Sequence, residues 1–332
     1  MRSFKTGSKN ISLADAMNES DWNILLRRIE DGRCTPFLGA GVNYGLLPLG
    51  SQIARQWAKE KEFPMKYSDD LARVAQFIAV KSDPMAPKEE IVDILKRRPN
   101  PDFSQPDERL ECLQTLAELP LPVYLTTNYD DLMVEALKAS SLRRNPRREI
   151  CRWRKHLRAI PSVLDSDDQY KLDPESLRRW EIENPIVFHL HGSDEHYESL
   201  VLTEDDYIDF LVNVSRDQKI LPPRIQRAFT DASLLFIGYR LQDVNFRVIY
   251  RGLVQSMEGS LRRLSVTVQV TPPDDHGGDP QMAREYLNAY FRGLDARVYW
   301  GTASQFAQEL RARWREYPKN RTRADAANPL HR

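Results

Sequence analysis

The fold class is decided by residues 34–41, which read Cys-Thr-Pro-Phe-Leu-Gly-Ala-Gly. The first five residues form a short apolar run that is typical of a buried strand, and this run leads directly into a glycine turn. Helical patterns lie on both sides: apolar residues recur at helical spacing within residues 22–29, and Leu49, Ile53 and Trp57 lie four apart after the turn. The sequence therefore predicts a strand, a turn and a helix of an α/β fold.

The same pattern of a buried strand followed by a polar turn and a helix recurs along the chain. The apolar runs that predict further strands are residues 121–127, 186–190, 232–237, 264–270 and 297–300. Strands that alternate with helices in this way are typical of a doubly wound parallel sheet. We therefore expect one α/β domain over residues 21–316.

Two stretches interrupt this alternation. Residues 60–118 have mostly helical spacing, and residues 141–185 are interpreted as an insertion or a small helical lobe. Within the second stretch, residues 143–158 contain eight Lys or Arg residues and one acid. A solvated helical face is the simpler interpretation of this basic stretch, and a contact with a partner or with a second copy of the chain is the alternative. Direct DNA binding ranks third, because aromatic interleaving is limited to Trp153.

The two ends of the chain are polar. Residues 1–20 are expected to form a loose lead-in, and residues 317–332 a disordered tail. The first residues lack the apolar core of a secretory signal, and no run of the sequence approaches the length of a membrane span, which favours a cytoplasmic protein. Thr302 and Gln305 predict a capping box at the start of the last helix.

Composition narrows the classes of function. The chain has 48 basic and 48 acidic residues, so its formal net charge is zero, and this disfavours general nucleic-acid binding. The three cysteines, Cys34, Cys112 and Cys151, are far apart, which argues against a disulfide framework and against a zinc ribbon. We therefore expect buried, reduced thiols and no bound metal.

Polar residues follow several predicted strands, where open parallel sheets bind their ligands. The glycine turn continues as Gly39-Ala40-Gly41-Val42-Asn43-Tyr44-Gly45, which suits close approach of the backbone to a pyrophosphate at a helix N-terminus. A tight turn without a ligand is the alternative. The second cluster, Thr126-Thr127-Asn128-Tyr129-Asp130, points hydroxyl and amide groups into the same crevice, although Asn128 or Asp130 could cap the next helix.

The third cluster is His189-Leu190-His191-Gly192-Ser193. Strand alternation predicts that the two histidines share a side opposite Leu190, with His189 packed deeper and His191 a candidate general base. The fourth cluster starts at Gly238-Tyr239, where glycine suits close backbone approach, and Asp243 is expected to cap the helix that follows. Four such turns predict one composite nucleotide crevice.

In this order the motifs Phe-Leu-Gly-Ala-Gly-Val, Thr-Thr-Asn-Tyr-Asp, His-Leu-His-Gly-Ser and Gly-Tyr-Arg-Leu-Gln-Asp resemble the sirtuin-like family. The sequence is most similar to a bacterial branch that acts as NAD hydrolases in anti-phage defence, and the segment 201–207 shares that similarity. The resemblance implies a Rossmann-like NAD-binding domain with a helical accessory lobe. It also implies that NAD is a substrate whose bond between nicotinamide and ribose is cleaved.

By this resemblance Asn128 and His191 form the catalytic pair. The residues that it places around NAD are Gly39, Ala40 and Gly41 near the phosphates and the nicotinamide-side ribose, Asp130 in the nicotinamide pocket, Gly238 and Tyr239 on the adenosine side, and Thr127 and Asn43 beside them. Asn43 stands where relatives usually have serine, so a hydroxyl contact is not expected there.

The four-cysteine zinc module of deacylating sirtuins cannot be built from three isolated cysteines, which favours hydrolysis of NAD to nicotinamide and ADP-ribose over deacylation. A module that senses NAD or ADP-ribose without cleaving it, and a zinc-independent deacylase, are the alternatives. The resemblance further implies a homo-oligomer, a separately encoded activator such as a HerA-type ATPase, and NAD depletion during abortive infection.

Overall fold

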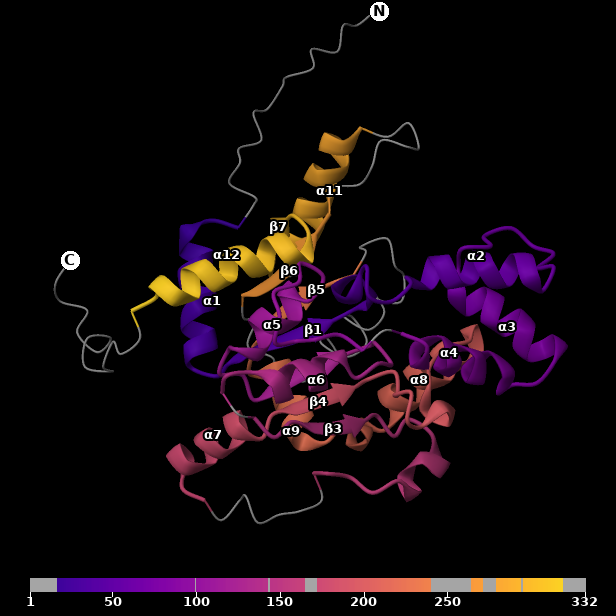
Figure 1. Ribbon diagram of the computed structural model, residues 1–332, viewed down its shortest axis with the longest axis horizontal. Coiled ribbons are helices and arrows are strands. Elements are labelled where there is room, and N and C mark those ends of the chain that lie inside the picture. Colours follow the sequence, from indigo (N-terminus) through magenta and orange to yellow (C-terminus); the bar gives the residue numbers. More distant parts are fainter. Residues whose placement is uncertain are drawn as a thin grey trace, which may run out of the picture.

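The computed structural model describes residues 17–98, 100–142, 144–164, 172–239, 264–270, 279–293 and 295–318 (Figure 1). The expected lead-in up to residue 16, the expected tail from residue 319 and the expected cap Asp243 lie outside the described residues. The strands are β1 (Cys34–Leu38), β2 (Val123–Thr126), β3 (Arg147–Ile150), β4 (Ile186–His189), β5 (Ser233–Ile237), β6 (Ser265–Gln269) and β7 (Ala296–Trp300). The helices are α1 (Glu19–Glu30), α2 (Gly50–Glu60), α3 (Leu71–Lys81), α4 (Ala86–Lys96), α5 (Glu111–Ala117), α6 (Leu132–Ala139), α7 (Pro174–Glu183), α8 (Glu204–Arg216), α9 (Pro223–Thr230), α11 (Pro280–Arg292) and α12 (Ala303–Glu316).

These strands form one seven-stranded sheet in the order β3-β4-β2-β1-β5-β6-β7, and every pair is parallel. Strands β2, β4 and β3 lie in that spatial order on one side of β1, and after β4 the chain crosses to β5 on the other side. The strand order therefore reverses at β1, and open sheets bind ligands at the carboxyl ends of the strands around such a switch point. This topology confirms the predicted doubly wound α/β sheet.

Strand β3 is not predicted by the pattern of apolar runs. Its sequence is Arg-Arg-Glu-Ile, and it forms the edge of the sheet, where Arg147 pairs with Ile186 and Ile150 with His189. An edge strand is only partly covered, so its residues need not form an apolar run. The interpretation of this stretch as a helical lobe is therefore wrong for residues 147–150, which belong to the sheet.

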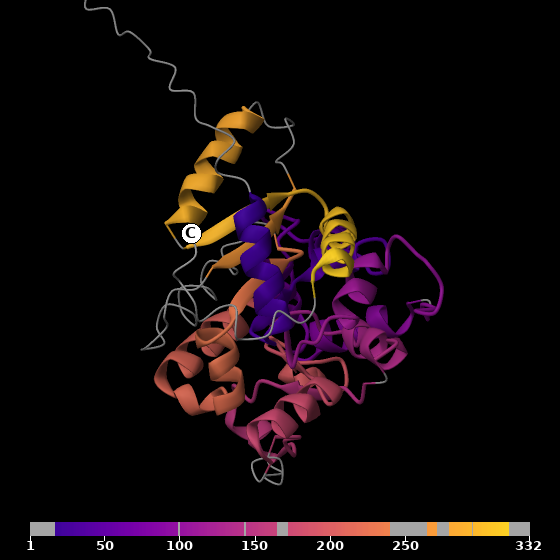
Figure 2. The same cartoon turned by 90° about the vertical axis from the view of Figure 1, so that its left-hand side faces the viewer.

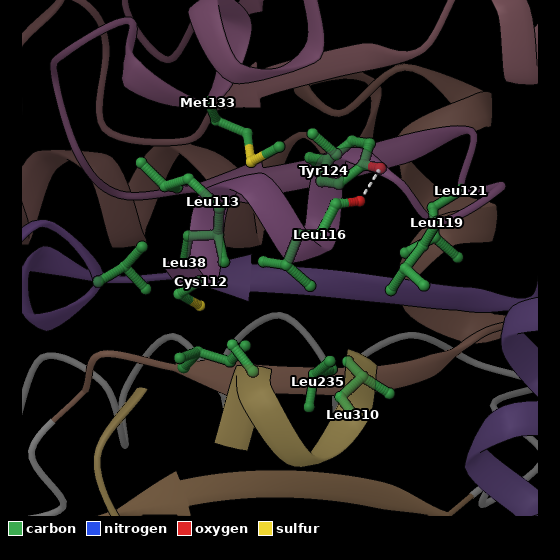
Figure 3. Packing of buried hydrophobic residues seen from close by; sticks show 14 of the residues in the cluster. Leu38, Cys112, Leu113, Leu116, Leu119, Leu121, Tyr124, Met133, Leu235 and Leu310 are labelled. Atoms are coloured by element: carbon green, nitrogen blue, oxygen red, sulfur yellow. Dashed lines mark hydrogen bonds between the residues drawn. The ribbon is translucent and has the colours of Figure 1, made fainter. Parts of the chain in front are cut away.

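Helices cover both faces of the sheet. Figure 2 shows α11 and α12 on opposite sides of β7. On one face α1, α5, α6 and α12 pack with Leu38 and Tyr124 in the cluster of Figure 3, where the Tyr124 hydroxyl donates to the Leu116 carbonyl over 2.9 Å. On the other face α8, α9 and α11 pack against Phe37 and Leu125. Because both faces are covered, β1, β2, β4 and β5 are buried along their whole length.

A third cluster forms a helical lobe from α2, α3 and α4, with Trp57 and Val74 among its buried residues. In Figure 1, α2 and α3 lie on the right-hand side, away from α1 and α12. Leu200 and Leu202, from the segment that follows β4, complete the cluster. The lobe is therefore packed against the same segment that carries the histidine motif. Near the end of the described chain, Thr302 and Gln305 form the predicted capping box of α12.

Candidate functional site

The turns that follow β1 and β5 are in direct backbone contact. Gly39 N donates to Ile237 O and Gly41 N donates to Gly238 O, each over 2.9 Å. Gly238 has φ +84°, and a Cβ atom at this position would lie 2.5 Å from the backbone nitrogen of Val42. Glycine is therefore required for the two turns to pack together. A four-residue 3-10 turn, Ala40–Asn43, follows Gly39, and α2 begins only at Gly50, so the expectation of an α-helix N-terminus at this turn is wrong.

Asn43 joins this glycine turn to the cluster after β2. Its Nδ2 donates to Asp130 Oδ2 over 2.8 Å, and both residues are buried. Asp130 Oδ1 also accepts from the backbone nitrogen of Leu132, the first residue of α6, but the N-cap of that helix is Asp131 and it has no side-chain cap bond. Burial raises the pKa of Asp130 to about 6. Asn43 Oδ1 is buried with no hydrogen-bond partner in the described part of the chain.

Thr127 and Tyr239 connect the turns after three strands. The Tyr239 hydroxyl donates to Leu38 O over 2.9 Å, and it lies 2.9 Å from Thr127 Oγ1. Since the tyrosine proton points to Leu38, Thr127 donates the second bond. Thr127 N also donates to Leu38 O over 3.0 Å. This link holds the ends of β1, β2 and β5 together at the switch point.

Asn128 is half-buried at the end of β2. Its backbone nitrogen donates to Thr126 Oγ1 over 2.9 Å, and its Nδ2 donates to Gly39 O over 3.2 Å. The side chain is therefore directed toward the glycine turn and does not cap α6. The carboxamide oxygen, Oδ1, is the atom of this side chain that is left to accept from a ligand or a water.

His191 lies in a buried aromatic setting. Its ring contacts Tyr207 and Phe210 of α8 edge-on, with ring centroids 5.2 and 5.3 Å away, and 3% of the residue is exposed. Burial lowers the pKa of His191 to about 3, so the imidazole is neutral near pH 7. Its Nε2 is buried and has no hydrogen-bond partner among the residues that the structure describes.

The regular alternation of side chains between the two faces of the sheet ends at His189, the last residue of β4. Residues 190 and 191 form a turn, and Gly192 follows with φ +83°. Leu190 belongs to the same cluster as Phe210, which the ring of His191 contacts. His191 is therefore not opposite Leu190 as predicted, because the turn rotates the chain after His189. His189 is fully buried, as expected for the deeper position.

Asn128 and His191 occupy equivalent positions on neighbouring strands. β2 and β4 pair in a register that places Thr126 beside His189. Asn128 lies two residues after Thr126, and His191 lies two residues after His189. The structure thus brings both residues to the carboxyl edge of the sheet. The glycine turns, the link between Thr127 and Tyr239, and the pair of Asn43 and Asp130 lie along the same edge.

The basic stretch is extensively ion-paired. Its described ion pairs are Arg148 with Asp131, Asp194 and Glu195, Arg152 with Glu149, Arg154 with Asp206 and Asp209, and Arg158 with Asp217. Trp153 is buried, and its Nε1 donates to Ser199 O over 2.8 Å. A solvated helical face is therefore wrong for residues 147–154, which form an edge strand and a loop with ion-paired arginines. It holds only for the short 3-10 helix Lys155–Ala159, where Lys155 and Arg158 are exposed.

Sequence reasoning missed a buried charged group beside that segment. Lys88 of α4 and Asp206 of α8 are both buried and paired, and Arg154 joins them. In sequence, Lys88 resembles any lysine of an amphipathic helix. The sequence feature that could have drawn attention to Asp206 is its spacing from Thr203, because the two residues form a capping box at the start of α8.

All three cysteines are buried, as predicted. Burial raises the thiol pKa of Cys34 and of Cys112 to about 12 and raises the pKa of Cys151 as well. The thiols therefore stay protonated and inert. Over the described ranges, no three His, Cys, Asp or Glu side chains come together as a metal site, and no helix combines the length and the apolar character that crossing a bilayer demands.

A doubly wound parallel sheet with glycine turns at its switch point defines a Rossmann-like α/β class of protein. Within that class the chain belongs to the SIR2-like domain family, whose family model matches residues 122–292, just over half of the chain. It is 25% identical over 225 residues to the NAD(+) hydrolase ThsA of Cytobacillus dafuensis, covering 68% of this chain and 38% of that protein. It is 24% identical over 228 residues to the NAD(+) hydrolase ThsA of Bacillus cereus (strain MSX-D12), covering 68% and 41%. The chain thus spans about two fifths of the length of the curated relatives that it matches.

Proposed function

We propose that this chain hydrolyses NAD to nicotinamide and ADP-ribose. Water adds to the ribose carbon that bears nicotinamide, nicotinamide leaves with the electrons of the broken bond, and one proton is released. The observation that carries the proposal is the equivalent placement of Asn128 and His191 at the ends of β2 and β4. The names of the two distant relatives support the choice of substrate.

The catalytic roles follow from the protonation and hydrogen-bonding state of the two side chains. A neutral imidazole offers a lone pair, and the lowered pKa of His191 keeps its ring neutral, so it can accept a hydrogen bond from a ribose hydroxyl or from the attacking water. Asn128 already donates to Gly39, and its carboxamide oxygen can orient the water or the ribose without a change of charge. Holding the ribose and one water in this geometry lowers the barrier as the ribose develops oxocarbenium character.

The other site residues are assigned to the remaining parts of NAD. We infer that Gly39, Ala40 and Gly41 lie near the phosphates and the nicotinamide-side ribose, and that Gly238 and Tyr239 line the adenosine side. Thr127 is assigned to the same crevice because it bonds to Tyr239. We assign Asp130 and Asn43 to the nicotinamide side, where Asn43 Oδ1, without a partner among the described residues, is a buried acceptor that suits an amide donor.

The test is release of nicotinamide from NAD by the purified full chain, followed by chromatography. Asn128→Ala and His191→Ala are each expected to abolish turnover while the circular dichroism spectrum stays native. His156→Ala is the matched control, because His156 is an exposed histidine to which no role in the site is assigned. Near-native turnover in either site variant would refute the assigned roles.

The same assay separates the alternative functions. A sensing module binds NAD or ADP-ribose in calorimetry but releases no nicotinamide. A zinc-independent deacylase releases nicotinamide only when an acylated peptide is present. The proposed hydrolase releases nicotinamide without peptide, so parallel reactions with and without peptide decide among the three.

We also propose that the activity depletes NAD in the cytoplasm during phage infection, that the chain forms homo-oligomers, and that a separately encoded protein such as a HerA-type ATPase activates it. The support is the resemblance to the defence branch of the family. Light scattering of the purified chain tests the assembly. The proposed activation is tested by measuring NAD levels in infected cells with and without a neighbouring gene. The His191→Ala variant is the control.

A further inference from the structure

His189 is the last residue of β4 and is fully buried. Its Nδ1 lies 3.0 Å from the backbone oxygen of Asn128. A carbonyl oxygen can only accept a hydrogen bond, so the proton of the neutral ring must be on Nδ1. Burial also lowers the pKa of His189 to about 4, which keeps the ring neutral at physiological pH. The contact therefore selects one tautomer of the imidazole, with Nε2 as an acceptor.

This bond completes a set of contacts that holds the Asn128 peptide. The Asn128 nitrogen donates to Thr126 Oγ1 over 2.9 Å, and Thr126 Oγ1 in turn donates to Leu38 O over 3.2 Å. The regular pairing of β2 with β4 ends just before this point, where Leu190 N donates to Thr126 O over 2.8 Å. The Asn128 carbonyl lies beyond that ladder, so His189 supplies the donor that the sheet no longer offers.

We propose that His189 is a positioning residue for Asn128: its Nδ1–H fixes the Asn128 backbone and thereby the direction of the Asn128 carboxamide. The inference rests on the proposed function, because Asn128 must first take part in NAD turnover or binding. A residue that only filled space at this position could be aliphatic, as Val187 is two positions earlier on the same strand. The Asn128 carbonyl instead requires a donor at the position of Nδ1, close to the backbone of β4.

Two amide substitutions test which ring nitrogen matters. The Nδ2 of asparagine can take the place of the histidine Nδ1, whereas the amide of glutamine reaches the position of Nε2. His189→Asn is expected to keep kcat within about threefold of the wild type, and His189→Gln to lose about 100-fold with little change in KM, because a displaced catalytic group costs rate more than binding. Melting temperatures of both variants show whether a loss reflects unfolding.

Equal losses in the two variants at equal stability would overturn the proposal, and so would a Gln variant that outperforms the Asn variant, since Nε2 would then be the functional atom. Nitrogen-15 NMR of the histidine rings tests the bond without any assay of activity. The chain has six histidines, and His189→Asn identifies the signal. An Nδ1-protonated ring is expected, and an Nε2-protonated ring would refute the contact whatever the activity of the variants.

The outcome can be separated from that of the proposed function. If the wild type binds NAD but releases no nicotinamide, hydrolysis is refuted while the positioning of Asn128 stays testable by affinity. His189→Gln should then weaken NAD binding about tenfold in calorimetry and His189→Asn should not, since a misplaced hydrogen-bonding group typically loses that much. Equal affinities of the two variants would overturn the positioning role.

Discussion

Lys88 Nζ lies 3.0 Å from the carboxylate of Asp206, and both side chains are buried between the helical lobe and the α/β domain. Lys88 also donates to Leu200 O over 2.8 Å, and Asp206 accepts from Arg154 Nη2 over 2.8 Å. Burial lowers the pKa of Lys88, and the charge of Asp206 partly opposes that shift. The pair therefore joins α4 to α8, the helix whose Tyr207 contacts His191.

Removing one partner of this pair should destabilise the chain strongly. Asp206→Asn is expected to lower the free energy of unfolding by about 3 kcal/mol or more, because it leaves the buried charge of Lys88 without its carboxylate. Lys88→Met should cost less but still more than about 1 kcal/mol, because Asp206 keeps Arg154 as a partner. Lys59→Met, at an exposed position of α2, should change it by less than about 0.5 kcal/mol. Urea unfolding followed by circular dichroism measures both. A loss in Lys88→Met no larger than that of the control would contradict the structural role of the pair.

Stability should fall as the pH is lowered from about 6.5 to about 4, because of the two buried histidines. Their pKa values are lowered to about 4 for His189 and about 3 for His191, so in this range the unfolded chain binds protons that the folded chain does not. His191→Gln removes one such site and should reduce the loss at about pH 5 by about 2 kcal/mol. Thermal melts across this pH range test the effect, and an unchanged pH dependence in the variant would count against a buried neutral His191.

Asp130 should change the pH dependence of stability in the direction opposite to that of the two histidines. Its pKa is raised to about 6, so between about pH 4 and pH 6 the folded chain holds a proton that the unfolded chain has lost, and this contribution to stability decreases as the pH rises. Asp130→Asn removes the opposing contribution, and the stability of this variant should therefore decline more steeply than that of the wild type as the pH is lowered below that pKa. The same melts with this variant provide the measurement, and a shallower acid decline would be the contrary result.

Gly238→Ala should disturb the contact between the turns after β1 and β5. The positive φ costs a side-chain-bearing residue about 1–2 kcal/mol, and the new Cβ would also overlap the backbone of Val42 and Gly39. We expect the free energy of unfolding to fall by about 2 kcal/mol or more and NAD turnover to be lost. Gly50→Ala is the control, since Gly50 is in a helix and its Cβ would meet only the side chain of Leu71. Equal stability of the two variants in urea unfolding would show that the turns can separate without penalty.

The sequence by itself determined the strands that form the middle of the sheet and the residues at their ends. A central parallel strand such as β1 or β5 is covered on both faces, so it appears as a continuous apolar run that can be recognised without its partners. The polar cluster that follows such a run lies at the carboxyl edge in any parallel sheet. For this reason Gly39, Asn128 and Gly238 could be assigned to one edge before their contacts were known.

Only the tertiary structure decided the contacts between residues that are far apart in the chain. Asn43 and Asp130 are 87 positions apart and Lys88 and Asp206 are 118 apart, so no local pattern links the members of either pair. The edge strand β3 lacks an apolar run because it is only partly covered. The orientation of His191 depends on the turn after β4 and on the packing of α8 against its ring. Side-chain direction and protonation are set by neighbours that only folding brings together, and for that reason a local sequence pattern does not encode them.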